Sequence, residues 1–365
     1  MVPRAPLSRK PTLHLFFSVG MVLSICLARG GWAAPPRAPV AHTDVQEFEV
    51  RPYLQKVTRT SIFISWRQTV EGNASIRYRP KGSRDEAKEK QIVGESKRKQ
   101  VKLTGLAPST EYEYVVALKG GISSGGTFRT AGGPEEPFSF LVVGDTRRGL
   151  IASHRSVVAA MALERPRFII HTGDLVARAH RGRYGDFFEV EAPLLSRAPL
   201  YPTLGNHEIA GSRSLGLELY RDFFILPEDG PEKELVYSFV YNNSLFLFLD
   251  TKDDLVGSDI ASWAVARLKK ANGNAHIRHI FVMVHHGPYS SGPHGSNEML
   301  HESGLAEAFG KYGVDVVFSG HDHLYERGVA DGFFYVITAG GGAPLYTPKK
   351  RLPQTRWIEK AFHYV

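Results

Sequence analysis

Apolar and polar residues alternate along the first part of the chain and give way to another pattern further on. Residues 61–66 and 112–116 show the period of two that is typical of strands with one buried face. Turn-forming residues separate such segments, so residues 45–131 are predicted to form an antiparallel sandwich of two sheets. The charged stretch 81–102 fits a solvated hairpin better than a binding patch. The glycines and proline at 132–134 mark the predicted boundary of this all-β domain.

Apolar runs of strand length alternate with helical stretches in the second part of the chain, which is assigned to residues 135–365. Helices are predicted at residues 153–164, 218–224, 260–270 and 304–311. This alternation is typical of an α/β domain, in which ligands bind at the carboxyl ends of strands. The final residues have the pattern of a strand that begins there, which favours a domain shortened at its C-terminus.

Oxygen and nitrogen donors follow the apolar runs of this second part at five places. These donors are Asp145, Asp174, Asn206, His285 and the pair His321 and His323. Gly320 can take the positive φ that a sharp turn requires. Alternate residues of an extended segment share a face, so His321 and His323 are predicted to point together and Asp322 away from them.

The chemistry of these donors indicates a metal site. Carboxylates, an amide oxygen and imidazoles together suit Mn, Zn or Fe, and no cysteine thiolate stands among them. The donors are too many for one tetrahedral ion. Two divalent ions that share a carboxylate therefore fit the set better.

The ordered motifs resemble those of the calcineurin-like metallophosphoesterase superfamily. They are Gly144-Asp145, Gly173-Asp174, Gly205-Asn206-His207-Glu208, Val284-His285 and Gly320-His321-Asp322-His323. The continuation at 324–327 and the upstream β-domain make the chain most similar to the purple acid phosphatase branch. Residues 103–112 are similar to the turn and tyrosine corner of a fibronectin type III domain, which precedes the catalytic domain in larger purple acid phosphatases. The resemblance implies an αββα catalytic sandwich.

The resemblance also implies roles for individual residues in hydrolysing a phosphate ester by attack of a metal-bound hydroxide. Asp174 would bridge the two ions, Asp145 and His323 would serve the first ion, and Asn206, His285 and His321 the second. His207 would bind phosphate or protonate the leaving group, Arg147 would grip a phosphate oxygen, and His294 would touch the substrate from a loop. His286 competes with His285 for the ligand role and is assigned to the second shell or the substrate rim.

Two positions depart from the family patterns. Purple acid phosphatases have Gly-Asp-x-x-Tyr, and Ala177 stands here where that tyrosine is expected. Other superfamily members have Asp-x-His at the first motif, where Arg147 stands. The first ion therefore lacks its usual extra protein ligand, and a purple colour is not expected unless Tyr184 or another tyrosine replaces it.

The N-terminal residues have the layout of a secretory signal peptide at 1–33, followed by a Pro/Ala-rich linker at 34–44. The apolar run is too short for a transmembrane anchor. Cys26, the only cysteine, leaves lipidation as an alternative. Removal of residues 1–33 would lower the formal net charge from +8 to +4, so no nucleic-acid partner is expected.

The sequence thus favours an exported, dinuclear phosphohydrolase acting on phosphate esters, with phosphomonoesters as the favoured substrates. Two alternatives remain open at this stage. One is a phosphodiesterase of the same fold. The other is a catalytically weak protein that binds metal or phosphate and engages a surface through its sandwich.

Overall fold

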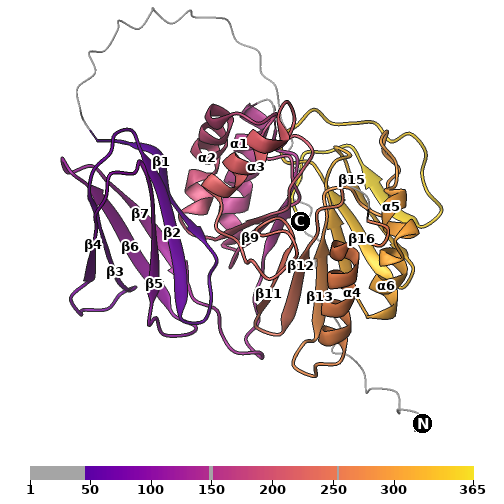
Figure 1. Ribbon diagram of the computed structural model, residues 1–365, viewed down its shortest axis with the longest axis horizontal. Helices are drawn as coiled ribbons and strands as arrows, with labels where there is room; N and C mark the ends of the chain where they lie inside the picture. The colour runs from indigo at the N-terminus through magenta and orange to yellow at the C-terminus, as the bar shows by residue number, and fades with distance from the viewer. Residues whose placement is uncertain (1–45, 148–150, 253–254) are drawn as a thin grey trace, which may run out of the picture.

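The computed structural model describes residues 46–147, 151–252 and 255–365, and Figure 1 shows its two parts along the chain. The predicted signal peptide, the linker and Cys26 lie outside these residues. Within the described ranges, no helix combines the length and the apolar character that crossing a membrane requires.

The first part is a sandwich of two antiparallel sheets, as predicted. Its strands are β1 (Phe48–Gln55), β2 (Ser61–Gln68), β3 (Ala74–Pro80), β4 (Lys88–Ile92), β5 (Arg98–Thr104), β6 (Glu111–Leu118) and β7 (Ser123–Arg129). One sheet has the order β1-β2-β5 and the other β4-β3-β6-β7. Trp66, Tyr114 and Phe128 are almost fully buried between the sheets. Alternation of these apolar residues with polar ones is what fixes the inner faces.

Two local predictions for the sandwich have different outcomes. The Tyr112 hydroxyl accepts a hydrogen bond of 2.9 Å from the backbone N–H of Ala107, the contact that a tyrosine corner makes. The hairpin predicted within residues 81–102 is wrong, because β4 pairs with β3 while β5 pairs with β2 in the other sheet. The residues of β4 are nevertheless largely exposed, as a solvated segment should be.

The second part is an α/β domain with two sheets between two groups of helices, also as predicted (Figure 1). The first half contains β8 (Leu141–Val143), α1 (Ile151–Glu164), β9 (Ile169–His171), α2 (Arg181–Leu195), β10 (Leu200–Pro202) and α3 (Arg213–Phe223). The second half contains β11 (Tyr237–Tyr241), β12 (Ser244–Phe248), α4 (Asp259–Asn272), β13 (His279–Met283), α5 (Glu298–Glu302), α6 (Leu305–Lys311), β14 (Val316–Ser319), β15 (Tyr325–Ala330), β16 (Phe333–Thr338) and β17 (Thr355–Glu359). The sheet orders are β10-β9-β8 and β11-β12-β13-β14-β16-β15-β17.

The four predicted helices are present as α1, α3, α4 and α6, whereas α2 and α5 were not predicted. Helix α2 carries Gly182, Gly185 and Pro193, which weaken its local preference for helix. Its Phe187 and Phe188 are buried, so packing against the rest of the domain stabilises the helix despite that preference.

Parallel pairing aligns the ends of the strands that carry the predicted donor residues within each of the two sheets. Strands β8, β9 and β10 run parallel to one another, and so do β12, β13 and β14. Beside β8, Val365 exchanges two backbone hydrogen bonds with Val142, at 2.7 and 2.9 Å. The predicted strand at the final residues is thus limited to this pairing of Val365 with Val142, because residues 361–365 form no regular strand.

The sandwich packs directly on the α/β domain through β1 and α2. The Tyr53 hydroxyl donates a hydrogen bond of 2.6 Å to the carbonyl oxygen of Phe223, and its ring lies 4.4 Å from that of Phe188. On β7, Gly126 lies so close to the Ser196 carbonyl that an added Cβ would collide with it. These contacts fix the two parts relative to each other.

Candidate metal centre

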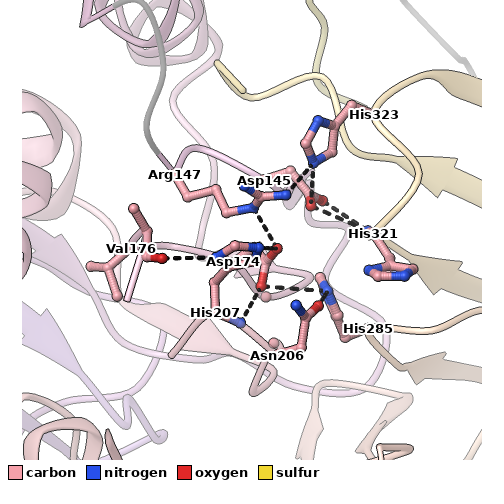
Figure 2. A network of polar contacts seen from close by, with 12 residues as sticks. Asp145, Arg147, Asp174, Val176, Asn206, His207, His285, His321 and His323 are labelled. Atoms are coloured by element: carbon pink, nitrogen blue, oxygen red, sulfur yellow. Dashed lines mark hydrogen bonds and ion pairs between the residues drawn. The ribbon is translucent and has the colours of Figure 1, made fainter. Parts of the chain in front are cut away.

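Five strand ends bring the predicted donor residues into one site (Figure 2). Asp145 follows β8, Asp174 follows β9, Asn206 follows β10, His285 follows β13, and His321 and His323 follow β14. The two aspartates, His285 and His323 are almost fully buried. Their order in the sequence and the parallel strands together account for this convergence.

Three of the donor residues share an unusual backbone conformation. Asp145, Asp174 and His321 have φ values of 58°, 59° and 71°, in the left-handed region. The prediction that Gly320 takes the positive φ is wrong, because His321 makes the turn instead. Gly320 is needed for space, since an added Cβ would lie 2.6 Å from Oδ2 of Asp145. Such backbone strain at residues whose side chains converge on one site is typical of functional sites.

The carboxylate of Asp174 contacts three neighbouring residues of the site. Its Oδ1 accepts a hydrogen bond of 2.9 Å from the His207 backbone, and its Oδ2 accepts one of 2.7 Å from Nε of Arg147. Nε2 of His285 lies 3.5 Å from Oδ1. Burial alone would raise the pKa of Asp174, but His285, His207 and Arg147 together hold that pKa below its usual value.

Glu208 supports the loops on either side of Asp174. Its carboxylate accepts backbone hydrogen bonds from Asp174 at 2.9 Å, Val176 at 3.1 Å and Gly205 at 2.7 Å. Burial, and then the charge of Asp174, raise the pKa of Glu208 to about 7. Sequence analysis placed Glu208 in a motif without giving it a task, and the structure supplies this one.

Two histidines are oriented by backbone carbonyls outside the site. Nδ1 of His285 donates to the Thr172 carbonyl at 2.8 Å, and Nδ1 of His323 donates to the Pro344 carbonyl at 2.7 Å. The carbonyls fix the tautomer and leave each Nε2 directed inward, the arrangement that metal-binding histidines generally have. These Nε2 atoms lie 3.1 Å from Oδ1 of Asn206 and 3.3 Å from Oδ1 of Asp145, respectively.

A second group of imidazoles surrounds His321. Ring atoms of His285, His286 and His321 lie within 4.8 Å of one another, as do donor atoms of Asp145, Asp174 and His285. Burial, followed by the neighbouring His285, lowers the pKa of His286 to about 3. From the sequence, His286 is expected beside the ligands and not among them. In the structure its ring lies within this group of three imidazoles.

The donor set passes a direct test of fit to metal ions. Nδ1 of His321 is buried and has no hydrogen-bond partner among the described residues. Burial, together with His285 and His286, strongly lowers the pKa of His321, so the ring presents an unprotonated nitrogen. A neutral imidazole with a free, buried nitrogen is a suitable ligand for Mn, Zn or Fe.

Comparison with known proteins identifies the family. The family described as calcineurin-like phosphoesterase matches residues 138–325, about half of the chain, and the purple acid phosphatase N-terminal domain matches residues 48–130. The chain belongs to the calcineurin-like phosphoesterase family.

Relatives of this phosphoesterase chain share its fold and part of its sequence. An uncharacterized protein of Mycobacterium tuberculosis is 28% identical over 262 residues, covering 62% of this chain and 49% of that protein. Probable purple acid phosphatase 20 of Arabidopsis thaliana is 29% identical over 233 residues, covering 61% and 53%. The structure of a purple acid phosphatase from yellow lupin seeds has the same fold, with a TM-score of 0.72 over 86% of this chain and 68% of that one at 17% identity. The chain spans about half the length of the curated relatives it matches.

The rim of this phosphoesterase site includes residues from two loops. The His294 ring lies 4.3 Å from that of His321, and the Tyr346 ring stacks on His323 at 4.1 Å. The Arg147 guanidinium also contacts the Tyr346 side chain. Sequence analysis considered His294 and missed Tyr346. Tyr346 belongs to none of the sequence motifs. The one signal for it in the sequence is an aromatic residue between two prolines, Pro344 and Pro348.

The loop that carries His294 is held by two buried carboxylates. Asp322 accepts a hydrogen bond of 3.1 Å from the His294 backbone and another from the Ser290 hydroxyl. Glu326 accepts from the backbone and hydroxyl of Ser291, at 2.7 and 2.8 Å. As predicted, Asp322 is directed away from its neighbouring histidines, and its task is to fix this loop.

Tyr184, which sequence analysis kept as a replacement for the missing tyrosine, lies elsewhere. Its ring is fully buried and stacks on Phe223 with 4.6 Å between centroids. The position after Asp174 that would carry the family tyrosine is occupied by Ala177, whose carbonyl accepts a hydrogen bond of 2.8 Å from Nδ1 of His207. His207 is thereby oriented with Nε2 4.0 Å from Oδ2 of Asp174.

Proposed function

We propose that this chain is a metal-dependent phosphoric ester hydrolase that uses two divalent ions. The observation that carries the proposal is the cluster of inward-directed imidazole nitrogens and buried carboxylates at the strand ends. Asp174 would be shared by both ions, with Asp145 and His323 serving the first. Asn206, His285 and His321 would hold the second, and His286 is close enough to compete for a place there.

The ions, which are Mn, Zn or Fe in this proposal, would supply Lewis-acid stabilisation of the phosphate oxygens and lower the pKa of water. The protein residues would bind and orient the ester and handle the proton of the leaving group. His207 is suited to the proton because its Nδ1 is fixed by the Ala177 carbonyl and 27% of its side chain is exposed. Arg147 can present two N–H groups to a phosphate oxygen pair.

Phosphomonoesters are the favoured substrates in this proposal. Arg147, His207 and His294 are the side chains beside the metal centre that could offer N–H donors to a phosphate. A terminal phosphate has three non-bridging oxygens to receive such donors, whereas a diester has two. Phosphodiesters are the alternative, because the loops that carry His294 and Tyr346 could also enclose a second ester group.

A parallel assay tests the proposal. The protein is stripped of metal by dialysis, reconstituted separately with Mn, Zn and Fe, and assayed on nitrophenyl phosphate and bis-nitrophenyl phosphate. We expect metal-dependent turnover with a preference for the monoester. Retained metal without turnover on either ester would instead favour a catalytically weak metal- or phosphate-binding protein.

We also propose that the protein is exported and that residues 1–33 are removed. The support is the basic start, the apolar run and the small residues around Ala33. Mass spectrometry of the protein from its native host would give a first residue near Ala34. An acylated Cys26 at the N-terminus would show a lipoprotein instead.

A further inference from the structure

A groove of about 1160 Å³ lies between the sandwich and the α/β domain. One wall is the outer face of the sheet formed by β3, β6 and β7. The other wall is formed by the loops that follow α1 and α2, at residues 165–167 and 196–198. Figure 1 shows the sandwich, in indigo and purple, beside helices α1 and α2 of the α/β domain. The close contact of Gly126 with Ser196 holds the two walls together at one end.

The groove is strongly basic. Seven of its lining residues are arginine or lysine and two are glutamate. Both glutamates already have partners, since Glu113 pairs with Arg79 at 2.5 Å and Glu111 pairs with Lys81 at 2.8 Å. Arg129 pairs with a glutamate outside the lining, Glu136, at 3.3 Å.

Four arginines in this lining form no salt bridge with a carboxylate among the residues that the structure describes. They are Arg77, Arg165, Arg167 and Arg197. Arg77 comes from the sandwich and the other three come from the α/β domain. Arg167 interacts electrostatically with the carboxylate of Glu136, so the charge without a carboxylate partner among the described residues is that of Arg77 on one wall and of Arg165 and Arg197 on the other. Clustered like charges raise the free energy of the folded protein unless an anion offsets them. Their convergence on one concave surface therefore indicates an anionic ligand.

The groove and the metal centre occupy opposite ends of the same strands. Residues 165–167 precede β9 and residues 196–198 precede β10, whereas Asp174 and Asn206 follow these strands. A ligand in the groove would leave the metal centre open. The groove is thus a separate binding surface, and its role does not depend on the reaction proposed above.

The lining favours phosphate groups over nucleobases. Six of the seven cations are arginines, whose planar guanidinium binds phosphate oxygens in pairs. The aromatic residues of the lining, Tyr78, Tyr114 and Phe128, are 5%, 2% and 1% exposed. They offer no ring face on which a base could stack, and such stacking is the usual feature of single-strand nucleic-acid sites. The volume of the groove, about 1160 Å³, is also larger than a single phosphate ion would fill.

We propose that this groove binds a linear phosphate polymer that carries no nucleobases. The polymer lies along the outer face of the sheet and is gripped by Arg77 from one side and by Arg165, Arg167 and Arg197 from the other. Its function is to hold the protein on a polyanionic material while the metal centre remains accessible.

Binding of fluorescent inorganic polyphosphate at 50 mM salt, measured by anisotropy on the full metal-loaded protein, tests this proposal. The groove variant combines R77Q, R165Q and R197Q. A matched control combines K269Q, K270Q and R356Q, which removes three exposed charges from other surfaces. We expect the Kd of the groove variant for polyphosphate to rise by about tenfold or more, and the slope of log Kd against log salt to fall by about two phosphate contacts. The Kd of the control should stay within about twofold of the wild-type value.

Further measurements separate the groove from the metal centre and from general charge effects. Hydrolysis of nitrophenyl phosphate should be unchanged in the groove variant, and Asp174→Asn should still bind polyphosphate. Equal loss in the groove and control variants, or no binding by wild type, would overturn the proposal. Equal affinity for oligothymidylate or polyglutamate of the same charge would overturn the assignment of a base-free phosphate polymer.

Discussion

Arg147 donates a hydrogen bond from Nε to Oδ2 of Asp174 at 2.7 Å, and its Nη2 lies 3.2 Å from Nε2 of His323. The guanidinium therefore contacts two of the atoms that are assigned here to metal binding. An arginine stays protonated and has no lone pair, so it cannot serve as a ligand itself. Ions bound at these atoms would displace the guanidinium, which would then be free to contact phosphate.

Replacing Arg147 should separate metal binding from turnover. We expect Arg147→Gln to bind Mn or Zn at least as tightly as wild type, because a competing cation is removed. The value of kcat/KM for nitrophenyl phosphate should fall by about tenfold or more, equivalent to about 1.4 kcal/mol. Arg147→Lys keeps the positive charge but loses the paired N–H donors. Its kcat/KM should lie between the values of wild type and Arg147→Gln. Loss of metal from Arg147→Gln would show that the arginine organises the ligands instead.

Replacing Asp174 and replacing His207 should have different effects on metal content and on turnover. Asp174→Ala should lose metal and activity together, because two cations would repel each other without the shared carboxylate. His207→Ala should keep its metal and lose turnover by a factor of about 10²–10⁴, the usual contribution of a general acid or base. Metal analysis after gel filtration, combined with steady-state kinetics, distinguishes them. Equal loss of metal in both variants would contradict this division of roles.

Asp322 should act on the substrate through His294. Asp322→Asn weakens the acceptor for the His294 backbone and should raise KM several-fold while metal content stays the same. Glu326→Gln is the comparison variant, because Glu326 fastens the same loop at Ser291. It shows how much of the effect comes from the loop as a whole and how much from the contact of Asp322 with the His294 backbone. In a double-mutant cycle, Asp322→Asn should have little further effect on KM when His294 is already alanine. Independent effects of the two substitutions would contradict this positioning role.

The iron-loaded, air-oxidised protein should lack the strong visible band of a tyrosinate bound to ferric iron. Ala177 has no donor to offer, and Tyr184 is held in the core against Phe223. Tyr346 is the tyrosine that stands beside the site, and burial raises the pKa of its hydroxyl. A visible spectrum with metal analysis checks the prediction. A purple band that disappears in Tyr346→Phe would contradict it and identify the ligand.

His363 should make the folded protein less stable in mild acid. Burial lowers its pKa to about 4 despite the nearby carbonyl of Ala361, whereas an unfolded histidine has a pKa of about 6.5. As the pH falls, His363 is therefore protonated in the unfolded state at a higher pH than in the folded state. The stabilising contribution of neutral His363 is therefore complete above about pH 6.5 and is lost as the pH falls toward 4, by up to about 3 kcal/mol at 1.36 kcal/mol per pH unit.

Denaturant unfolding of metal-free protein between pH 7.5 and 4.5 measures this effect. His363→Asn keeps a donor near the Nδ1 position, toward the Ala361 carbonyl, and does not titrate. The variant should show a smaller loss of stability over this pH range than wild type. Identical pH profiles would show that other groups dominate acid unfolding.

The strand ends could be predicted from the sequence because their signals are local. An apolar run that ends in glycine and a polar donor identifies the end of a buried strand, and ligands of α/β domains bind at the carboxyl ends of strands. Five such ends in one domain therefore indicate a shared site, which the two sheets build together. The sandwich could be predicted for the same reason, because the alternation of apolar and polar residues is visible within each single strand. Neither inference needs information about distant segments.

Other parts of the site depend on contacts that are remote in sequence. Tyr346 reaches His323 from a loop that follows β16, and His286 joins His321 only because β13 and β14 are neighbours. The conformation of His321 was mispredicted because close packing against Asp145 reserves the adjacent position for glycine. Helix α2 was missed because its glycines and proline obscure a pattern that only the packed domain reveals.

The segment from Gly320 to Glu326 has two sets of partners at interleaved positions. His321 and His323 face the candidate ion site, while Asp322 and Glu326 fasten the loop that carries His294. An insertion or deletion of one residue between His321 and His323 would move a histidine or Asp322 out of its place, so a change of length here should disturb the candidate ion site and the fastened loop together. In the fastened loop between Ser291 and His294, by contrast, a residue can be exchanged without moving a candidate metal ligand.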